Sequence, residues 1–483
     1  MIHQLPQELI HEISLLLSQN DVLHLAYCSK ALYSVIQPRL YYGITVNASH
    51  RAATSSRVTV PNQENQISLQ TINTTSLFSL KLLFKNLMQF PQYCTYIKYL
   101  SFSCKIPDIN DSQLLQYLDE IIPNCTNLVV FNWYNYNFDF PLALIRNCKL
   151  FHLNGNFDTS DLPSNKWNLS TLNLSSLCLD TKLDLSKFSN LKTLVLSKSK
   201  SATNDFRYHR VEQRVEPEYD PRLSTFINNI HPLTSLSFKN LNLTYNEQLY
   251  HPNLENLSII DCVVDDEFLP LLSPHLTNLK HLNISLQNDD SNMALFRFLH
   301  HLQVISLNVT LNLSSLDDLN HSVYKLLMNV GNLEFLNLKY NIDPTISTTK
   351  CDTISLHSAF CTLSRMNLEY LNLSLPQYQF TCILPILRSL CKLNFLDLTL
   401  LGTDFDCPLA TISSNNTLIS QDLVDYYTVV ESQEEVQLNQ YKNYANDIKC
   451  GMPQLKSMVL GSELDRFYFE ADGFGMRHRG DMR

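Results

Sequence analysis

The stretch Leu333-Glu334-Phe335-Leu336-Asn337-Leu338 has leucine at its first, fourth and sixth positions, and this pattern recurs along most of the chain. Copies with the same apolar spacing occupy 169–174, 191–196, 254–259, 279–284, 302–307, 368–373 and 393–398. Looser copies are 97–102, 128–133, 233–238 and 455–460, and 150–155 is the weakest because Gly155 stands at an apolar position. One copy fits any strand or helix, but a dozen copies, spaced mostly in the low to middle twenties of residues, predict a repeat protein.

Each copy predicts a short strand whose three apolar side chains are buried only when neighbouring repeats stack on one another. The period falls within the ~20–29 residues of leucine-rich repeats, and the chain resembles that family. Cys262 and Asn341 stand at the ninth position of their copies, where the family uses such side chains to bond the backbone of the turn. Helix-like stretches lie between strands at 266–272, 292–299 and 322–328. We therefore predict an α/β fold, a leucine-rich-repeat solenoid with a curved parallel sheet inside and helices outside.

Three short helices are expected before the repeats. The first begins at Pro6, whose missing N–H costs nothing there, and its apolar residues follow helical spacing at Leu9, Ile10, Ile13, Leu16 and Leu17. A break at 18–21 predicts a second helix over 22–28, capped by Asn20 or Asp21. A third helix over 30–36 is expected to stop at Pro38.

This N-terminal segment resembles the F-box family from Leu5 to Val46. It has the start Leu-Pro-x-Glu-Leu, then Leu-x-Leu-Ala-x-Cys-Ser-Lys-x-Leu-Tyr, then Pro-x-Leu-Tyr-x-x-Ile, with Tyr33 where many members carry Trp. The resemblance implies that the helices pack onto a Skp adaptor, which in turn binds a cullin. The residues expected to bind the adaptor are Leu5, Pro6, Glu8, Leu9, Ile10, Ile13, Leu17, Leu23, Leu25, Cys28, Leu32 and Tyr33. The alternative is a plain three-helix cap on the repeats.

The expected organisation is an all-α F-box over 1–46, a linker and connecting helix over 47–95, the repeats over 96–464 and a cap or tail over 465–483. The connecting helix is an apolar stretch over 77–90 that ends before Pro91. Two stretches interrupt the repeats, near 198–222 and 402–451, and each is either a binding insertion or surface decoration. Phe467 and Phe469 are expected to cover the last repeat and leave Arg477 to Arg483 exposed, the alternative being a disordered terminus.

The residues between the leucines should lie on the open face of the sheet. Phe335, Tyr370 and Phe395 occupy one position in successive copies, and Asn337, Asn372 and Asp397 occupy another. Because exposed aromatic rows and amide side chains suit a peptide partner, we expect these six residues to bind a protein substrate. The partner is expected to carry apolar anchors, and to be basic if Glu334, Glu369 and Asp397 contribute. The alternative is that the insertion over 402–451 covers the rings.

Charge, motifs and cysteine spacing exclude several classes of function. The formal net charge of −10 and the lack of a concentrated basic face argue against nucleic-acid binding. No metal-ligand, nucleotide-binding or catalytic motif is present, so we expect no cofactor, no metal and no catalysis. Thirteen cysteines without a close pair favour a reducing compartment, cytoplasmic and/or nuclear. The start of the chain is not typical of a signal peptide, and no apolar run is long enough to span a membrane.

The F-box resemblance then implies the substrate-recognition subunit of an SCF-type ubiquitin ligase (Skp adaptor, cullin and F-box protein). It would bind the adaptor through the F-box and a protein substrate through the repeats. A non-degradative scaffold that uses the same adaptor is the alternative, and the substrate's identity is not written in the sequence.

Overall fold

The computed structural model describes residues 5–17, 19–46, 72–74, 77–102, 111–133, 140–158, 167–174, 185, 188–198, 230, 232–243, 251–265, 267–287, 292–313, 316–331, 333–342, 361–376, 380–401, 438, 441–443, 445–446, 448–449, 452, 454–461, 466–472 and 475–481. The chain divides into two compact units, Met1–Leu241 and Asn242–Arg483, and each is described by itself.

Unit 1 begins with three short helices, α1 (Gln7–Leu16), α2 (Gln19–Cys28) and α3 (Lys30–Leu40). Pro6 caps α1, since its carbonyl accepts the N–H groups of Leu9 and Ile10 at 3.1 and 3.2 Å. The Ser29 hydroxyl caps α3 by accepting the Leu32 N–H at 3.1 Å. Their common core is small, and it consists of Ile10, Val22, Ala26, Leu32 and Ile36.

Two expectations for these helices were wrong. The second helix begins at Gln19, so that Asn20 and Asp21 lie in its first turn and do not cap it. The third helix does not stop at Pro38 but continues to Leu40. The proline lies close enough to the C-terminus that it removes one hydrogen bond from the last turns, and the helix ends two residues later.

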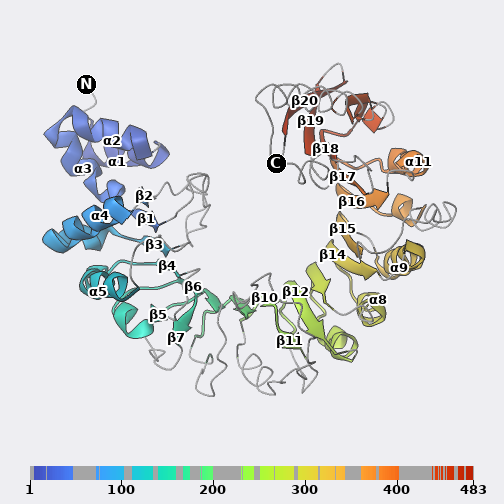
Figure 1. Ribbon diagram of the computed structural model, residues 1–483, viewed down its shortest axis with the longest axis horizontal. Coiled ribbons are helices and arrows are strands. Elements are labelled where there is room, and N and C mark those ends of the chain that lie inside the picture. The colour runs from blue at the N-terminus through green and yellow to red at the C-terminus, as the bar shows by residue number, and fades with distance from the viewer. Residues whose placement is uncertain are drawn as a thin grey trace, which may run out of the picture. The chain divides into compact units, whose positions relative to one another are not determined.

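The rest of unit 1 is a parallel sheet with helical segments beside it (Figure 1). Its strands pair in the order β2 (Ile72–Thr74), β1 (Gly43–Val46), β3 (Tyr99–Phe102), β4 (Val130–Trp133), β6 (His152–Gly155), β8 (Thr171–Leu174), β9 (Thr193–Ser197) and β10 (Ser235–Lys239). The helical segments are α4 (Leu77–Gln89), η3 (Pro91–Tyr96), α5 (Asp111–Ile121), η4 (Ile122–Asn124) and η5 (Leu142–Ile145), and a short pair joins β5 (Phe140–Pro141) to β7 (Phe157–Asp158). Strand β1 follows α3 directly and pairs with β3, so the three helices run straight into the sheet.

Gly155 is at the apolar position of the weakest copy of the pattern, and the structure shows why. It pairs with Trp133 on the neighbouring strand and has φ of +132°, which other residues rarely adopt. A Cβ atom at this position would collide with the carbonyl oxygen of Trp133. The backbone of Trp133 therefore takes the space that a side chain at 155 would need, and the Trp133 ring itself is fully buried.

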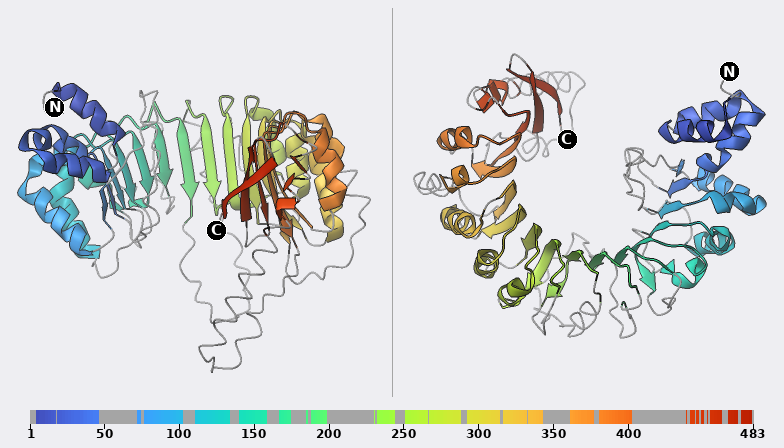
Figure 2. Two further views of the ribbon diagram at one scale, coloured as in Figure 1. Left: turned by 90° about the horizontal axis from the view of Figure 1, so that it is seen from above. Right: turned by 180° about the vertical axis from the view of Figure 1, so that it is seen from behind.

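The strands of unit 2 are parallel except for the last two, which are antiparallel (Figure 2). The parallel strands are β11 (Asn242–Leu243), β12 (Asn256–Val264), β13 (His281–Leu286), β14 (Ser306–Leu313), β15 (Phe335–Ile342), β16 (Tyr370–Pro376), β17 (Phe395–Leu401) and β18 (Ser457–Gly461). The antiparallel strands are β19 (Arg466–Asp472) and β20 (Gly475–Asp481).

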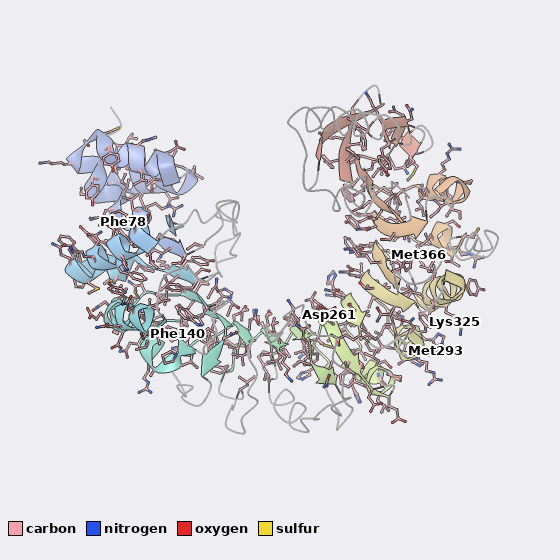
Figure 3. The ribbon with its side chains drawn as sticks, in the orientation of Figure 1. Phe78, Phe140, Asp261, Met293, Lys325 and Met366 are labelled. Carbon is pink, nitrogen blue, oxygen red and sulfur yellow. The ribbon has the colours of Figure 1, made fainter. Side chains whose placement is uncertain are left out.

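Helical segments cover one face of the unit 2 sheet (Figure 1). They are α7 (Phe268–Leu272), η8 (Ser273–His275), α8 (Asn292–His300), α9 (Leu316–Asn329), η10 (Thr362–Arg365) and α11 (Phe380–Ser389). In Figure 3, Met293 and Lys325 lie on this helical side and Asp261 lies on the opposite face of the sheet. The leucines of each copy, such as Leu336 and Leu338, are fully buried. Since side chains alternate along a strand, the residues between them face away from the helices.

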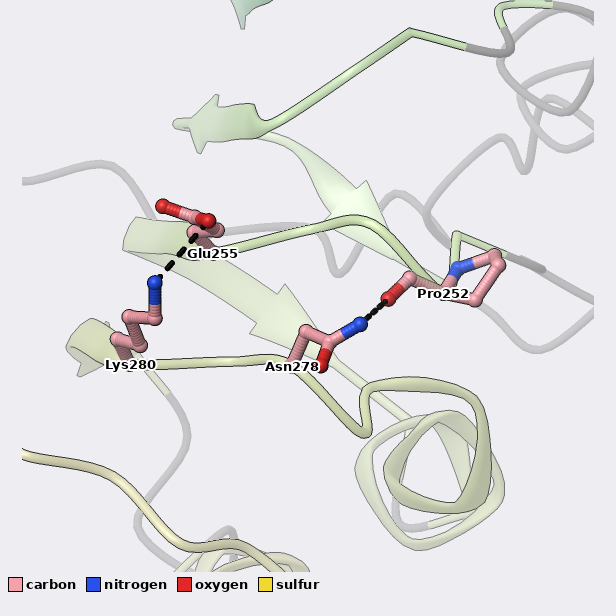
Figure 4. Close-up of polar contacts among 4 residues, drawn as sticks. All are labelled: Pro252, Glu255, Asn278 and Lys280. Carbon is pink, nitrogen blue, oxygen red and sulfur yellow. Dashed lines mark hydrogen bonds and ion pairs between the residues drawn. The ribbon is translucent and has the colours of Figure 1, made fainter.

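Polar side chains join neighbouring repeats just before the strands begin. The Asn278 side chain donates to the carbonyl of Pro252 at 2.6 Å, and the Lys280 ammonium pairs with the Glu255 carboxylate at 3.1 Å (Figure 4). In unit 1 the Asn127 side chain donates to the carbonyl of Thr95 at 2.8 Å in the same way. Such bonds satisfy carbonyl groups that the sheet does not pair, and they fix the spacing of adjacent repeats.

The structure confirms the α/β class with mostly parallel strands. It also confirms the helices expected over 266–272, 292–299 and 322–328, together with the one over 77–90 that ends before Pro91. Residues 466–472 and 475–481 form antiparallel strands, and Phe467 and Phe469 are buried there as expected. The side chains of Arg477 to Arg483, whose exposure was expected, lie outside the described part of the chain. Most of the two stretches near 198–222 and 402–451 also lies outside it.

One copy of the pattern was read in the wrong frame. The sequence offered Leu302 as its first position, but strand β14 pairs Leu307 with Leu336, which is the fourth position of its own copy. The frame therefore starts at Val304, and Ile305 is exposed. The error arose because apolar residues fit both frames, and only the register between strands separates them.

Candidate functional site

The first candidate site is the surface of the three N-terminal helices. Of the residues expected to bind an adaptor, Ile10 and Leu32 are buried in the helices' own core. Leu17, Leu23 and Leu25 are half-buried, and the exposed ones are Leu5, Pro6, Glu8, Leu9, Ile13, Cys28 and Tyr33. The structure thus divides the expected set into residues that hold the helices together and residues that are available to a partner.

Helix α1 presents a continuous apolar face to solvent. Leu9, Ile13 and Leu16 are spaced by four and three residues, which places them on one side of the helix. The exposed fractions are 50% for Leu9 and 88% for Leu16. A free helix gains nothing from such a face, because each of these side chains would be more stable when buried.

Two exposed apolar residues were missed by the sequence reasoning. Leu16 was recognised in the helical pattern but not as a binding residue, although its spacing from Leu9 and Ile13 could have placed it on the exposed face. Tyr27 in α2 is 84% exposed, and no sequence signal distinguished it from a core aromatic. Together with α1, it makes this unit rich in unpartnered apolar surface.

A cluster of tyrosines joins the helices to the first repeat. The rings of Tyr41 and Tyr93 stack with centroids 4.8 Å apart, and the Asn86 side chain of α4 donates to the Tyr41 hydroxyl at 2.6 Å. Burial raises the pKa of the Tyr33 phenol, and its interactions with Tyr93 raise it further. Tyr33 is therefore partly engaged in this joint as well as exposed, and the joint holds α3 against η3 and α4.

The second candidate site is on unit 2, and we call Phe335, Tyr370 and Phe395 the ring row. These residues pair across β15, β16 and β17. Their rings stack almost parallel, with centroids 4.1 Å apart between the first two and 4.7 Å between the last two. All three rings are half-buried. Each face of the Tyr370 ring is covered by a neighbour, so the stack exposes ring edges.

Beside the ring row runs a row of amides. Asn283, Asn308, Asn337, Asn372 and Asp397 pair with one another across five strands. Asn308 takes the place that the wrong frame had given to Ser306, and Ser306 itself pairs with Phe335. The sequence reasoning missed Asn308 for that reason alone.

The amide row is less open than expected. Asn372 and Asp397 are only 5% and 6% exposed, and the Asn372 side chain donates to the Asp397 carboxylate at 3.1 Å. The Oδ1 atoms of Asn337 and Asn372 are buried without a hydrogen-bond partner. A buried amide oxygen without a hydrogen-bond partner lowers the stability of the fold. An N–H donor brought to it would therefore be stabilising.

Acidic residues flank the ring row on its other side. Glu334 and Glu369 are exposed and immediately precede Phe335 and Tyr370. The Glu369 N–H donates to the Glu334 carbonyl at 2.8 Å, so the two residues occupy matching positions on adjacent strands. Glu255 and Lys280 have the same backbone relation, at 2.9 Å, and their side chains form an ion pair. Three repeats further on, the cation is replaced by a second carboxylate.

Neither a comparison with protein-family models nor one with curated proteins finds a match for this chain. Within the described ranges, no helix is long and apolar enough to cross a membrane. The same residues contain no group of three or more histidine, cysteine, aspartate or glutamate side chains suited to a metal ion. The two candidate sites therefore rest on their own geometry.

Proposed function

We propose that this chain is the substrate-recognition subunit of an SCF-type ubiquitin ligase. Its three N-terminal helices act as an F-box that binds a Skp adaptor, and its repeats form a leucine-rich-repeat solenoid that holds a protein substrate. In this role the chain transfers nothing itself and positions the substrate relative to the ubiquitin carrier.

The apolar face of α1 is the observation that supports the proposal most. Three helices of 10, 10 and 11 residues bury little surface among themselves, and small units of this size need a partner to complete their core. Leu9, Ile13 and Leu16 supply such an interface, beside the Leu-Pro start that resembles the F-box family. The tyrosine joint supports the proposal further, since a receptor must hold its substrate at a fixed place relative to the adaptor.

The sheets support the second half of the proposal. In unit 2, successive strands from β12 to β18 are parallel, with one copy of the leucine pattern each, and their register shifts only after Ile260 in β12. Such arrays present a row of side chains from each repeat on one broad face, which is how repeat proteins bind extended partners.

The proposal is tested by co-purifying the full chain with a recombinant Skp adaptor. Full burial of a leucine side chain contributes roughly 1.5–3 kcal/mol, so Leu9 and Leu16, with their exposed fractions of 50% and 88%, should together contribute about 3 kcal/mol. The double variant Leu9→Ala and Leu16→Ala should therefore weaken adaptor binding by about 100-fold. A matched control is Met328→Ala, which truncates a half-exposed apolar residue of α9 in unit 2 and should leave adaptor binding unchanged.

A thermal melt separates binding from folding. Because Leu9 and Leu16 are already exposed, the double variant should unfold at nearly the wild-type temperature. Wild-type adaptor binding by the folded double variant would contradict the proposal. A cullin in the purified complex, and a partner protein that accumulates when the chain is deleted, would favour the receptor, whereas adaptor without cullin would identify a non-degradative scaffold.

A further inference from the structure

The ring row and the two carboxylates beside it indicate the chemistry of the partner. We infer that they bind a basic, extended segment of a protein, in which leucine-like side chains cover the rings and an arginine or lysine pairs with Glu334 and Glu369. The inference rests on the proposed role of the repeats as a protein-binding surface, and it adds the class of the partner.

The stacked rings fix the apolar half of this surface. Both faces of Tyr370 are covered by neighbouring rings at 4.1 and 4.7 Å, so a cation cannot lie on a face of the central ring. The exposed edges carry partial positive charge, which makes them a poor place for an ammonium or guanidinium group. They instead offer a flat apolar strip across three strands, suited to aliphatic side chains.

The carboxylates fix the charged half. Glu334 and Glu369 lie on adjacent parallel strands, whose backbones are about 4.8 Å apart, and like charges placed directly opposite are destabilising. No described cation pairs with either residue, whereas Glu255 in the same row is paired with Lys280. A basic side chain from outside would relieve the repulsion. The net charge of −10 also favours the approach of a basic partner over long distances.

The amides of this surface favour a peptide as its partner. The Oδ1 atoms of Asn337 and Asn372 lack hydrogen-bond partners and belong to the same sheet face, two residues beyond Phe335 and Tyr370. Rotation of the half-buried Asn337 side chain brings its oxygen to a peptide N–H next to the rings, whereas the Asn372 side chain is held by its bond to Asp397. An extended segment with apolar and basic side chains uses all three features at once.

The test measures binding of two fluorescein-labelled peptides to the full chain by fluorescence anisotropy. One is Gly-Leu-Arg-Leu-Arg-Leu-Gly, and the other has Glu in place of each Arg. We expect the basic peptide to bind, the acidic one to fail, and the affinity to fall several-fold between about 50 mM and about 500 mM salt. The double variant E334Q and E369Q should weaken binding about fivefold or more, while E255Q, the matched control in the same row, should stay within about twofold.

A second variant, Tyr370→Leu, removes the central ring, and it should weaken binding of the basic peptide at both salt concentrations. Equal binding of both peptides, no binding of either, or unchanged affinity in the E334Q and E369Q variant would overturn the inference. Adaptor capture is measured on the same preparation. Loss of peptide binding with intact adaptor capture would contradict only the inference. Peptide binding without adaptor capture would contradict the proposed function and still support the inferred binding surface.

Discussion

Replacing Gly155 with alanine is the sharpest test of how the repeats of unit 1 pack. The φ of +132° at this residue is accessible to glycine, and an L-residue held there is strained by about 1–3 kcal/mol. The added Cβ also collides with the carbonyl of Trp133. This carbonyl cannot yield easily, because the buried Trp133 ring packs with centroids 5.0 Å from Phe102 and 4.9 Å from Phe140.

Strain and overpacking together should cost about 3 kcal/mol or more. For a unit spanning Met1–Leu241, such a loss lowers the unfolding temperature by about 6–12 °C. The only two tryptophans of the chain, Trp133 and Trp167, both belong to this unit. Tryptophan emission during thermal or denaturant unfolding therefore reports on unit 1 alone.

The matched control is Gly331→Ala, because a Cβ atom at Gly331 meets nothing within 4 Å. Circular dichroism of this control should show an unfolding temperature within a few degrees of wild type, since an unstrained glycine-to-alanine change alters stability by less than about 1 kcal/mol. The reasoning fails if Gly155→Ala shows a wild-type transition in tryptophan emission. It also fails if Gly331→Ala is equally destabilising.

Three further predictions concern the thiols, the end of the chain and the tyrosine joint. Burial raises the pKa of the Cys148 thiol from 9.0 to about 12, which lowers its thiolate fraction at pH 8 about a thousandfold; mass spectrometry after brief alkylation of the folded protein should find exposed Cys391 modified and Cys148 intact. Truncation after Leu464 removes β19 and its buried rings, so circular dichroism should show a lower melting temperature, and an unchanged melt would refute the role of the tail as a cap. The variant Tyr41→Phe deprives the Asn86 side chain of its acceptor and should cost about 1 kcal/mol in unit 1, measured by tryptophan emission in urea; a stability equal to wild type would show that the joint does not depend on this bond.

The sequence by itself determined the local elements, because their signals are periodic and short-range. The recurring leucines of copies such as Leu333 to Leu338 marked the strands, and the same spacing brought Phe335, Tyr370 and Phe395 to one position before any pairing was known. Helical spacing likewise marked α1, since side chains four residues apart share a face whatever the helix packs against.

Only the tertiary structure decided what depends on pairing between distant segments. Register between β14 and β15 separated two frames that the apolar residues of 302–309 fit equally well, and it added Asn308 to the amide row. Pairing between β4 and β6 opposed Gly155 to Trp133, so a glycine that weakened the pattern proved necessary for it. Burial of Asn372 and the exposure of Tyr27 were also beyond the sequence. Spacing along one strand or helix says which side chains share a face, but not whether anything covers it.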